Sequence, residues 1–269
     1  MKPITSADNP TFRRWLRLSE SPREVRLQGR TLAEGLHLAE AIHATRHPIE
    51  AILVRRSADR GAEVQGWIDA LRATGVPAFE LATGLFDRLT PVERGSGLLL
   101  LIALPDPPLL ETGDALFLDG VQDPGNAGAL LRVAAAAGVR TVLASPGTVA
   151  LWSPKVLRGS QGAHFRLALH EDVVANEVHV KLPMPWIGAT AHAGTPLWAT
   201  RLTHDAVGFM IGAEGGGLSP AAGAACDELV TIPLAGGVES LNVASAAAVC
   251  LFERRRQLGT LHSGSSPSA

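Results

Sequence analysis

The chain has 269 residues, 46% of them hydrophobic, which is enough to build one large domain or two ordinary domains around buried cores. Its formal net charge of -2 does not by itself indicate a nucleic-acid partner, and its 4% of aromatic residues argues against a surface built to stack bases. The two cysteines, Cys226 and Cys250, fit neither a metal spacing nor a disulfide framework, so we expect a reducing, cytoplasmic compartment. The start shows no apolar signal segment, the longest apolar run is too short to span a bilayer, and the nine histidines show no metal spacing. We therefore expect no secretion, no membrane and no metal.

Residues 1–103 are predicted to form a small α/β domain. Their apolar patterns favour a helix at 30–42, a strand at 50–56, a helix at 62–75 and a strand at 76–82. A proline-rich stretch at 104–114 follows and is predicted to be a linker.

Residues 115–259 are predicted to form a second domain. A strand at 115–119, a helix at 127–138 and a strand at 139–145 make a βαβ unit, which implies a parallel sheet with a right-handed crossover. Further strands are expected at 185–190, 206–212 and 228–233, and an Ala-rich helix follows the last of them. The small polar residues of 260–269 predict a disordered tail.

The loop and helix at 123–138, DPGNAGALLRVAAAAG, contain a single charged side chain within an apolar helix. A helix of Ala, Leu, Val and Gly is expected to be buried on all sides, and a buried Arg132 would need a partner or a function. The alternative is a structural ion pair or a salt bridge between subunits. Asn126 stands where an N-cap is expected, and it could be no more than a cap.

Two further loops leave predicted strands. The first, GAEGGG, places Glu214 among four glycines; it lacks the spacing of a dinucleotide or P-loop motif, and a tight turn is the simpler interpretation. The second, ESLN, places Ser240 and Asn242 at the start of the Ala-rich helix, where they could be caps or a site. The loops at the carboxyl ends of parallel strands are where α/β sheets bind ligands.

Three ordered stretches resemble motifs of the SpoU/TrmH family of RNA ribose 2'-O-methyltransferases, within the SPOUT superfamily: DPGNAGALLRVAAAAG, IGAEGGGLSP and IPLAGGVESLNVASAAAVCLFE. The segment KVLRGSQGAHFRL at 155–167 is similar to a further family segment between these motifs. Together they cover about 115–256, and the N-terminal part is more loosely similar to the family's substrate-binding domain.

The resemblance implies an α/β fold with a C-terminal parallel-sheet catalytic domain that contains a deep trefoil knot, preceded by a small α/β substrate-binding domain. It also implies a homodimer with active sites at the interface and S-adenosyl-L-methionine as the methyl donor. By its position in the first motif, Arg132 would be the catalytic arginine. Arginine is a poor base, so its expected role is to stabilise the negative charge that develops on the 2'-oxygen. Arginine as the base stays possible. The remaining implied site residues fall into two groups. Arg132, the ribose and the phosphate would be positioned by Asn126, Glu214, Ser240 and Asn242, and Glu214 would hold Arg132. The cofactor would be lined by Thr190, Gly212, Ile232, Leu234 and Leu241.

Six arginines lie between residues 13 and 30, with only two acids among them. Arg13, Arg14 and Arg17 can share one helix face; charge alone favours a solvated helix, and the family resemblance favours RNA binding. The arginines at 254–256 have two open interpretations, which are a complement to a helix C-terminus and an RNA contact.

The predicted function is methylation of a ribose 2'-hydroxyl in structured RNA, with ribosomal RNA favoured over transfer RNA. A nucleotide-dependent oxidoreductase is the competing enzyme, but the loop after the strand at 115–119 lacks G-x-G-x-x-G. A non-catalytic RNA-binding protein on the same fold is the third possibility, and the intact motif residues argue against it.

Overall fold

The computed structural model describes residues 1–57, 61–90, 95–106, 112–236 and 238–263. Its contacts divide the chain into two compact units, Met1–Asp106 with Trp152–Phe165, and Pro107–Leu151 with Arg166–Ala269. In the part described, no helix is both long enough and apolar enough to cross a membrane. Of the predicted linker, residues 107–111 lie outside the described residues, as do residues 264–269 of the predicted tail.

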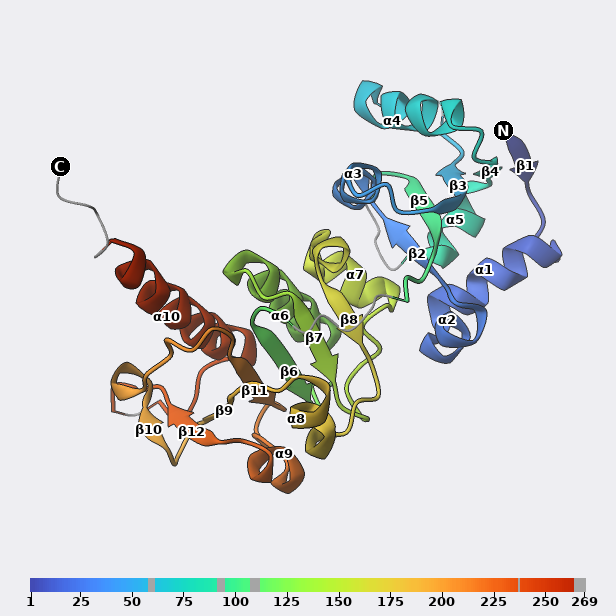
Figure 1. The fold of residues 1–269 in the computed structure, drawn as a ribbon. Coiled ribbons are helices and arrows are strands. Elements are labelled where there is room, and N and C mark those ends of the chain that lie inside the picture. The colour runs from blue at the N-terminus through green and yellow to red at the C-terminus, as the bar shows by residue number, and fades with distance from the viewer. Residues whose placement is uncertain (58–60, 91–94, 107–111, 237, 264–269) are drawn as a thin grey trace, which may run out of the picture. The chain divides into compact units, whose positions relative to one another are not determined.

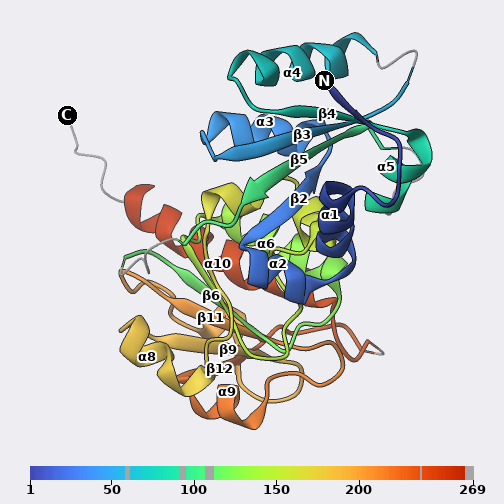
Figure 2. The same cartoon turned by 90° about the vertical axis from the view of Figure 1, so that its right-hand side faces the viewer.

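The first unit is built on a five-stranded sheet with the order β1-β4-β3-β5-β2 (Figures 1 and 2). Its strands are β1 (Lys2–Ile4), β2 (Arg30–Glu34), β3 (Ile49–Arg55), β4 (Ala78–Leu81) and β5 (Leu98–Ala103). Its helices are α1 (Pro10–Glu20), α2 (Pro22–Gln28), α3 (Leu36–Ala44), α4 (Ala62–Ala73), α5 (Thr83–Leu89) and α7 (Pro154–Ser160). Strands β1, β4 and β3 pair in parallel, whereas β5 runs antiparallel to both β3 and β2. Strand β4 and helix α4 lie within the predicted segments, whereas β3 begins one residue before its segment and α3 ends two residues after its segment.

Residues 30–34 form strand β2, so the helix predicted at 30–42 is wrong over its first turn. The apolar side chains of Leu32 and Ala33 are buried in pairing with β5 rather than on a helix face. Gly35 has a φ of 102°, a conformation that separates the strand from α3 and that favours glycine. Short apolar runs are ambiguous between strand and helix, and pairing with the buried β5 decides this one.

The segment Trp152–Phe165 packs with the first unit although it follows β7 in the sequence. The hydroxyl of Thr31 donates a hydrogen bond of 2.8 Å to the carbonyl of Trp152. A Cβ at Gly162 would lie 2.7 Å from the Cβ of Ala41, so α3 and this segment are in close contact. The sequence patterns did not predict that part of the family-like segment at 155–167 would join the N-terminal unit.

The second unit is built on a seven-stranded sheet with the order β10-β12-β9-β11-β6-β7-β8, in which every pairing is parallel. The strands are β6 (Ala115–Asp119), β7 (Thr141–Ala144), β8 (Ala168–His170), β9 (Trp186–Thr190), β10 (Thr195–Pro196), β11 (Gly208–Gly212) and β12 (Glu228–Thr231). The helices are α6 (Pro124–Ala137), α8 (Val178–Lys181), α9 (Pro220–Ala224) and α10 (Val243–Ser263), with short 3-10 turns between them. The predicted parallel sheet is confirmed.

Both faces of this sheet are covered. One face packs a cluster that includes Phe117, Trp186 and Met210 against α8, α9 and their connections. Helices α6 and α10 pack side by side against the sheet and each other (Figure 1). Helix α10 continues to Ser263, four residues into the segment predicted as a tail.

Helix α6 differs from its prediction in two ways. Its N-cap is Asp123, whose carboxylate accepts the backbone N–H of Asn126 at 2.7 Å, so Asn126 is not the cap but lies in the first turn. The helix is not buried on all sides, because Arg132 and Ala136 are exposed on the side that faces away from α10 and the sheet. The apolar composition of α6 therefore leaves a surface of small side chains open in a single chain.

The arginines at 254–256 all have protein partners. Arg254 is 1% exposed; its guanidinium binds both carboxylate oxygens of Asp114, at 3.2 and 3.1 Å, and the carbonyl of Leu202. Arg255 donates to the carbonyl of Ala137, so it complements the C-terminus of α6 rather than that of its own helix. Of the two open interpretations, an RNA contact does not apply to Arg254, because its side chain is buried in an ion pair.

We expect replacement of Glu34 by glutamine to stabilise the first unit at neutral pH. Burial raises the pKa of the Glu34 carboxyl, while a hydrogen bond from Thr90 and the charge of Arg158 lower it less. Its Oε1 atom is buried without a hydrogen-bond partner in the described part of the chain. Because the folded pKa is raised, ionisation costs stability as the pH rises through it.

The Glu34→Gln variant should therefore melt a few degrees higher than the parent at pH 7, since about 1 kcal/mol shifts Tm by about 4–8 °C in a domain of this size. The difference should shrink as the pH falls through the raised pKa of Glu34 towards the usual carboxyl range. Glu50→Gln is the control, because Glu50 pairs with Arg30 at 2.5 Å and its loss gives no such gain. Calorimetry across pH measures both, and a destabilised Glu34→Gln protein would contradict the assignment.

Candidate functional site

Three loops at the carboxyl ends of the central strands of the second unit meet around one pocket. The lining segments follow β9, β11 and β12, and the pocket has a volume of about 420 Å³. Its walls are formed by Ala189, Thr190, Ala191, His192, Ile211, Gly212, Ala213, Glu214, Gly215, Gly217, Ile232, Leu234, Glu239, Ser240, Leu241, Asn242, Val243 and Ala246. All five predicted cofactor-lining residues and three of the five predicted catalytic residues are among these.

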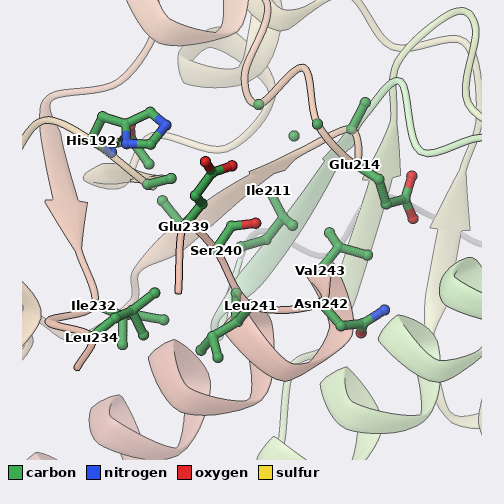
Figure 3. A pocket seen from close by; sticks show the side chains of 18 residues that line it. His192, Ile211, Glu214, Ile232, Leu234, Glu239, Ser240, Leu241, Asn242 and Val243 are labelled. Carbon is green, nitrogen blue, oxygen red and sulfur yellow. Dashed lines mark hydrogen bonds between the residues drawn. The ribbon is translucent and has the colours of Figure 1, made fainter. Parts of the chain in front are cut away.

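The side chains divide the pocket into an apolar and a polar part. Figure 3 shows Ile232 and Leu234 gathered on one side, near Leu241, and Glu214 on the other. Glu239 and Ser240 lie between them, and Asn242 lies on the side of Glu214. The pocket thus offers an apolar wall next to a set of hydrogen-bonding groups, which is the usual makeup of a small-molecule site.

The glycine-rich loop after β11 is a tight turn that carries Glu214 at its tip. Ala213 and Gly217 exchange two backbone hydrogen bonds, of 3.1 and 2.9 Å. A Cβ at Gly212 would lie 2.1 Å from the backbone of Gly217, so only glycine allows the turn to fold back onto the strand. The simpler interpretation of this loop, a tight turn, is correct, and the turn also brings a carboxylate into the pocket.

Asn242 begins helix α10 as its cap. Its backbone carbonyl accepts the N–H of Ala246 at 2.9 Å, and its side-chain oxygen accepts the N–H groups of Ala244 and Ser245 at 3.0 and 3.4 Å. The two interpretations of this turn, cap and site, therefore both apply. The cap also fixes the orientation of the Asn242 amide, because its oxygen is occupied and its nitrogen must point elsewhere.

A chain of three side chains joins the loops after β11 and β12 to the first turn of α6. The amide nitrogen of Asn242 donates to the side-chain oxygen of Asn126 at 2.9 Å, and the nitrogen of Asn126 donates to a carboxylate oxygen of Glu214 at 2.5 Å. Every donor in this chain faces an acceptor, so one arrangement of both amides satisfies all three groups. Residues distant in sequence are thereby held as one unit at the edge of the pocket.

Arg132 does not lie in the pocket of its own chain. It is exposed, and among the described residues no carboxylate forms an ion pair with it, Glu214 included. Arg132 follows Asn126 by six positions, which places it about 9 Å further along the helix. The helix rotates over these positions by roughly a third of a turn less than two full turns, so the two residues lie on different sides of α6. The expected Arg132–Glu214 pair is wrong for the isolated chain, because Glu214 is bound by Asn126 from another side of α6.

The predicted RNA-binding arginines lie on α1, in the other unit. All three are exposed, and the opposite side of the helix buries Phe12, Trp15 and Leu18. Arg13 pairs with Asp8, and Arg17 lies 3.6 Å from Glu24. Arg14 has no ion-pair partner among the residues that the structure describes, so it offers the most available charge of the three.

Two residues that support or line the pocket were not selected from the sequence, whereas Glu239 lines it from the polar turn at 239–242 that the sequence marks as a candidate site. His192 lines the pocket from the segment after β9. Asp119, at the end of β6, accepts the backbone N–H of Ser219 at 2.6 Å and so anchors the loop that follows Glu214. An Asp at the end of a buried strand was the one visible signal for the last of these. No group of three or more metal-binding side chains occurs in the described ranges.

Comparison with known proteins identifies the family. The model of the SpoU rRNA Methylase family matches residues 115–252, which is about half of the chain. The chain belongs to this family. The resemblance predicted from the three motifs is confirmed, and the chain is an enzyme of the methyltransferase class. The competing oxidoreductase is therefore excluded.

Relatives and solved structures match over nearly the whole length. The 23S rRNA (guanosine(2553)-2'-O)-methyltransferase RlmP of Bacillus subtilis (strain 168) is 29% identical over 265 residues, covering 95% of this chain and 100% of that protein. A crystal structure of an RNA 2'-O ribose methyltransferase superposes with a TM-score of 0.79 at 30% identity, covering 95% of this chain and 99% of that one. The SpoU methyltransferase AviRb of Streptomyces viridochromogenes, solved with AdoMet, gives a TM-score of 0.80 at 25% identity and covers 94% of this chain and 100% of that one. The similarity therefore includes both units.

We expect Asn126→Asp to destabilise the second unit in a pH-dependent way. The substitution replaces a donor to Glu214 by a second carboxylate, and two neighbouring carboxylates raise the pKa of the pair. The loss should be largest at neutral pH and should shrink as the pH falls through the raised pKa, where the pair takes up a proton. A cost of about 1 kcal/mol corresponds to a fall in Tm of about 2–4 °C for a domain of this size.

Thermal unfolding measured from about pH 5 to pH 8 checks this effect, because most domains are maximally stable in this range. Gln122→Glu is the matched control, because Gln122 is exposed on the same loop and the substitution changes the charge equally. An Asn126→Asp protein with the same pH dependence as the control would show that the amide chain is not a stabilising unit.

Proposed function

We propose that this chain transfers a methyl group from S-adenosyl-L-methionine to a ribose 2'-hydroxyl in ribosomal RNA. The observation that carries the proposal is one pocket lined by the motif loops after β11 and β12, to whose edge the Asn242–Asn126–Glu214 chain ties the motif that follows β6. Family membership supports the reaction class, and the full-length similarity to RlmP supports ribosomal RNA as the substrate. A non-catalytic RNA-binding role is disfavoured because the polar groups of the pocket are intact and mutually satisfied.

The lining of the pocket fits this methyl donor. Ile232, Leu234 and Leu241 provide an apolar surface for an adenine ring, and Gly212 contributes to the lining of the pocket through its backbone. Among the described lining residues there is no Lys or Arg to bind a phosphate. A nucleoside without phosphates suits this lining better than a dinucleotide does.

The reaction needs alignment more than strong chemical activation. The donor supplies a methyl group already activated by the sulfonium charge. A ribose 2'-oxygen attacks the methyl carbon, so that an O–C bond forms as the C–S bond breaks, and the hydroxyl proton passes to a neighbouring phosphate or to water. Holding the reacting groups in line can contribute roughly 7–11 kcal/mol. Ser240 and the amide chain of Asn126 and Asn242 provide the fixed groups that orient the ribose.

Arg132 stabilises the negative charge that develops on the 2'-oxygen. A guanidinium keeps its proton in proteins, so it serves as a charge and a double donor rather than as a base. Because Arg132 lies outside the pocket of its own chain, it must be brought to the reacting atoms by the bound RNA or by a second subunit.

We assign the active enzyme as a homodimer formed through α6 and α10. The outer sides of these adjacent helices carry uncharged side chains that a single chain leaves open, including Ala136 and Phe252, which is 48% exposed. Arg132 lies on the same outer side of α6. A second copy packed there would cover the apolar surface and would place Arg132 at the interface, next to the active sites.

The N-terminal unit captures the RNA. The C-terminal part of the second unit forms the trefoil knot of the family. The exposed arginines of α1, with Arg14 unpaired among the described residues, support the first assignment. Membership in the family and the all-parallel sheet support the second. The place of action is the cytoplasm, in keeping with a ribosomal RNA substrate.

The Arg132 variants test the catalytic role. Removing a group that stabilises an oxyanion costs about 10²–10³ in kcat, so Arg132→Ala should lose at least this much in single-turnover methylation. Arg132→Lys keeps the charge but loses the planar fork, so its loss should be smaller. Donor affinity should change little in either variant. A folded, dimeric Arg132→Ala enzyme with near-normal turnover would remove Arg132 from the mechanism.

The dimer assignment predicts the effect of a charge at Phe252. Phe252→Asp should shift the mass measured by light scattering from about twice the 28.1 kDa chain towards that of one chain, because the carboxylate would be buried at the interface. Val180→Asp is the matched control, since Val180 is 87% exposed on α8, away from α6 and α10. A parent protein that methylates RNA as a monomer would contradict the assignment.

A further inference from the structure

The pocket contains carboxylates but no permanent cation. Of its described lining residues, the ionisable ones are His192, Glu214 and Glu239, and none is a Lys or Arg. Glu214 is bound by the amide of Asn126. Glu239 is exposed and makes no hydrogen bond or ion pair with the described residues, so its charge is available to a ligand.

We propose that Glu239 makes the pocket favour the methyl donor over the demethylated product. The inference rests on the proposed function. The two molecules have nearly the same shape and share the adenosine and amino-acid groups, but the donor carries a sulfonium charge that the product, a thioether, lacks. A carboxylate near the bound sulfur attracts the donor and has no comparable interaction with the product.

The two carboxylates of the pocket differ in what they can contribute. Glu214 is held at the tip of a closed turn and shares its charge with a hydrogen-bond donor. Glu239 lies in the last loop, between the apolar wall and Glu214, and its side chain extends into the pocket in Figure 3. Glu239 is therefore the carboxylate whose removal alters charge without breaking the hydrogen-bond chain.

Discrimination of this kind matters because the product leaves the same pocket that the donor must enter. A methyltransferase that binds its product as tightly as its donor is inhibited as product accumulates. An exposed carboxylate adds a preference for the charged molecule without a new shape requirement. The preference for the donor over the product should be modest, because solvent and salt screen an exposed charge.

Calorimetric titration of the full-length protein with S-adenosylmethionine and, separately, with S-adenosylhomocysteine tests the proposal. Glu239→Gln should reduce the ratio of the two affinities by about two- to fivefold, the range expected for an exposed charge pair. The reduction should come mainly from weaker binding of the donor, and it should diminish at high salt. Glu177→Gln is the matched control, because this exposed carboxylate pairs with Lys181 on another part of the same unit.

The outcomes separate this inference from the function on which it rests. An unchanged ratio in Glu239→Gln would overturn it, and so would an equal loss for both molecules, which would place Glu239 on a group that they share. The same change in Glu177→Gln would assign the effect to net charge rather than to the pocket. Failure of the parent protein to bind either molecule would instead refute the proposed methyl donor.

Discussion

The site depends on the hydrogen-bond chain from Asn242 through Asn126 to Glu214. Its direction is set by the cap of α10: because the oxygen of Asn242 accepts two backbone N–H groups, its nitrogen is left to donate to Asn126. Asn126 must then donate to Glu214. A local feature of helix formation thereby fixes the geometry of two other loops, one of which lies 116 residues away in sequence.

The far half of α10 is fixed by a different interaction. Arg254 binds Asp114 at the entrance to β6 and the carbonyls of Leu202 and Asp205, and the carboxylate of Asp114 also accepts the N–H of Val207. Breaking one member would leave a buried charge without its partner, which is among the costly defects in a protein interior. The helix is thus held by polar contacts at both ends, and its start cannot move independently of the strands that surround the pocket.

Sequence patterns predicted more of the second unit than of the first. The βαβ pattern at 115–145 and the loops at strand ends predicted the parallel sheet and the place of the site, because long periodic segments and carboxyl-end loops carry strong signals. Strand β2 was missed because its pairing with β5 is a tertiary effect. The packing of Trp152–Phe165 with the N-terminal unit has no local sequence signature. The cap of α6 is Asp123 rather than Asn126, because proline at the first helical position sets the start of the helix one turn earlier.

The placement of Arg132 follows from the same helix. Asn126 must face Glu214 and Asn242, and the rotation of an α-helix then directs a side chain six residues later away from them. Within this chain the motif does not bring both residues to one point, because Asn126 binds Glu214 and Asn242 while Arg132 is exposed outside the pocket. The arginine therefore lies on the outer side of α6 together with small uncharged side chains, where a charge without a partner contributes nothing to the fold of the monomer. In the proposed dimer, the guanidinium on that surface would meet the oxygen and phosphate groups that its planar geometry fits.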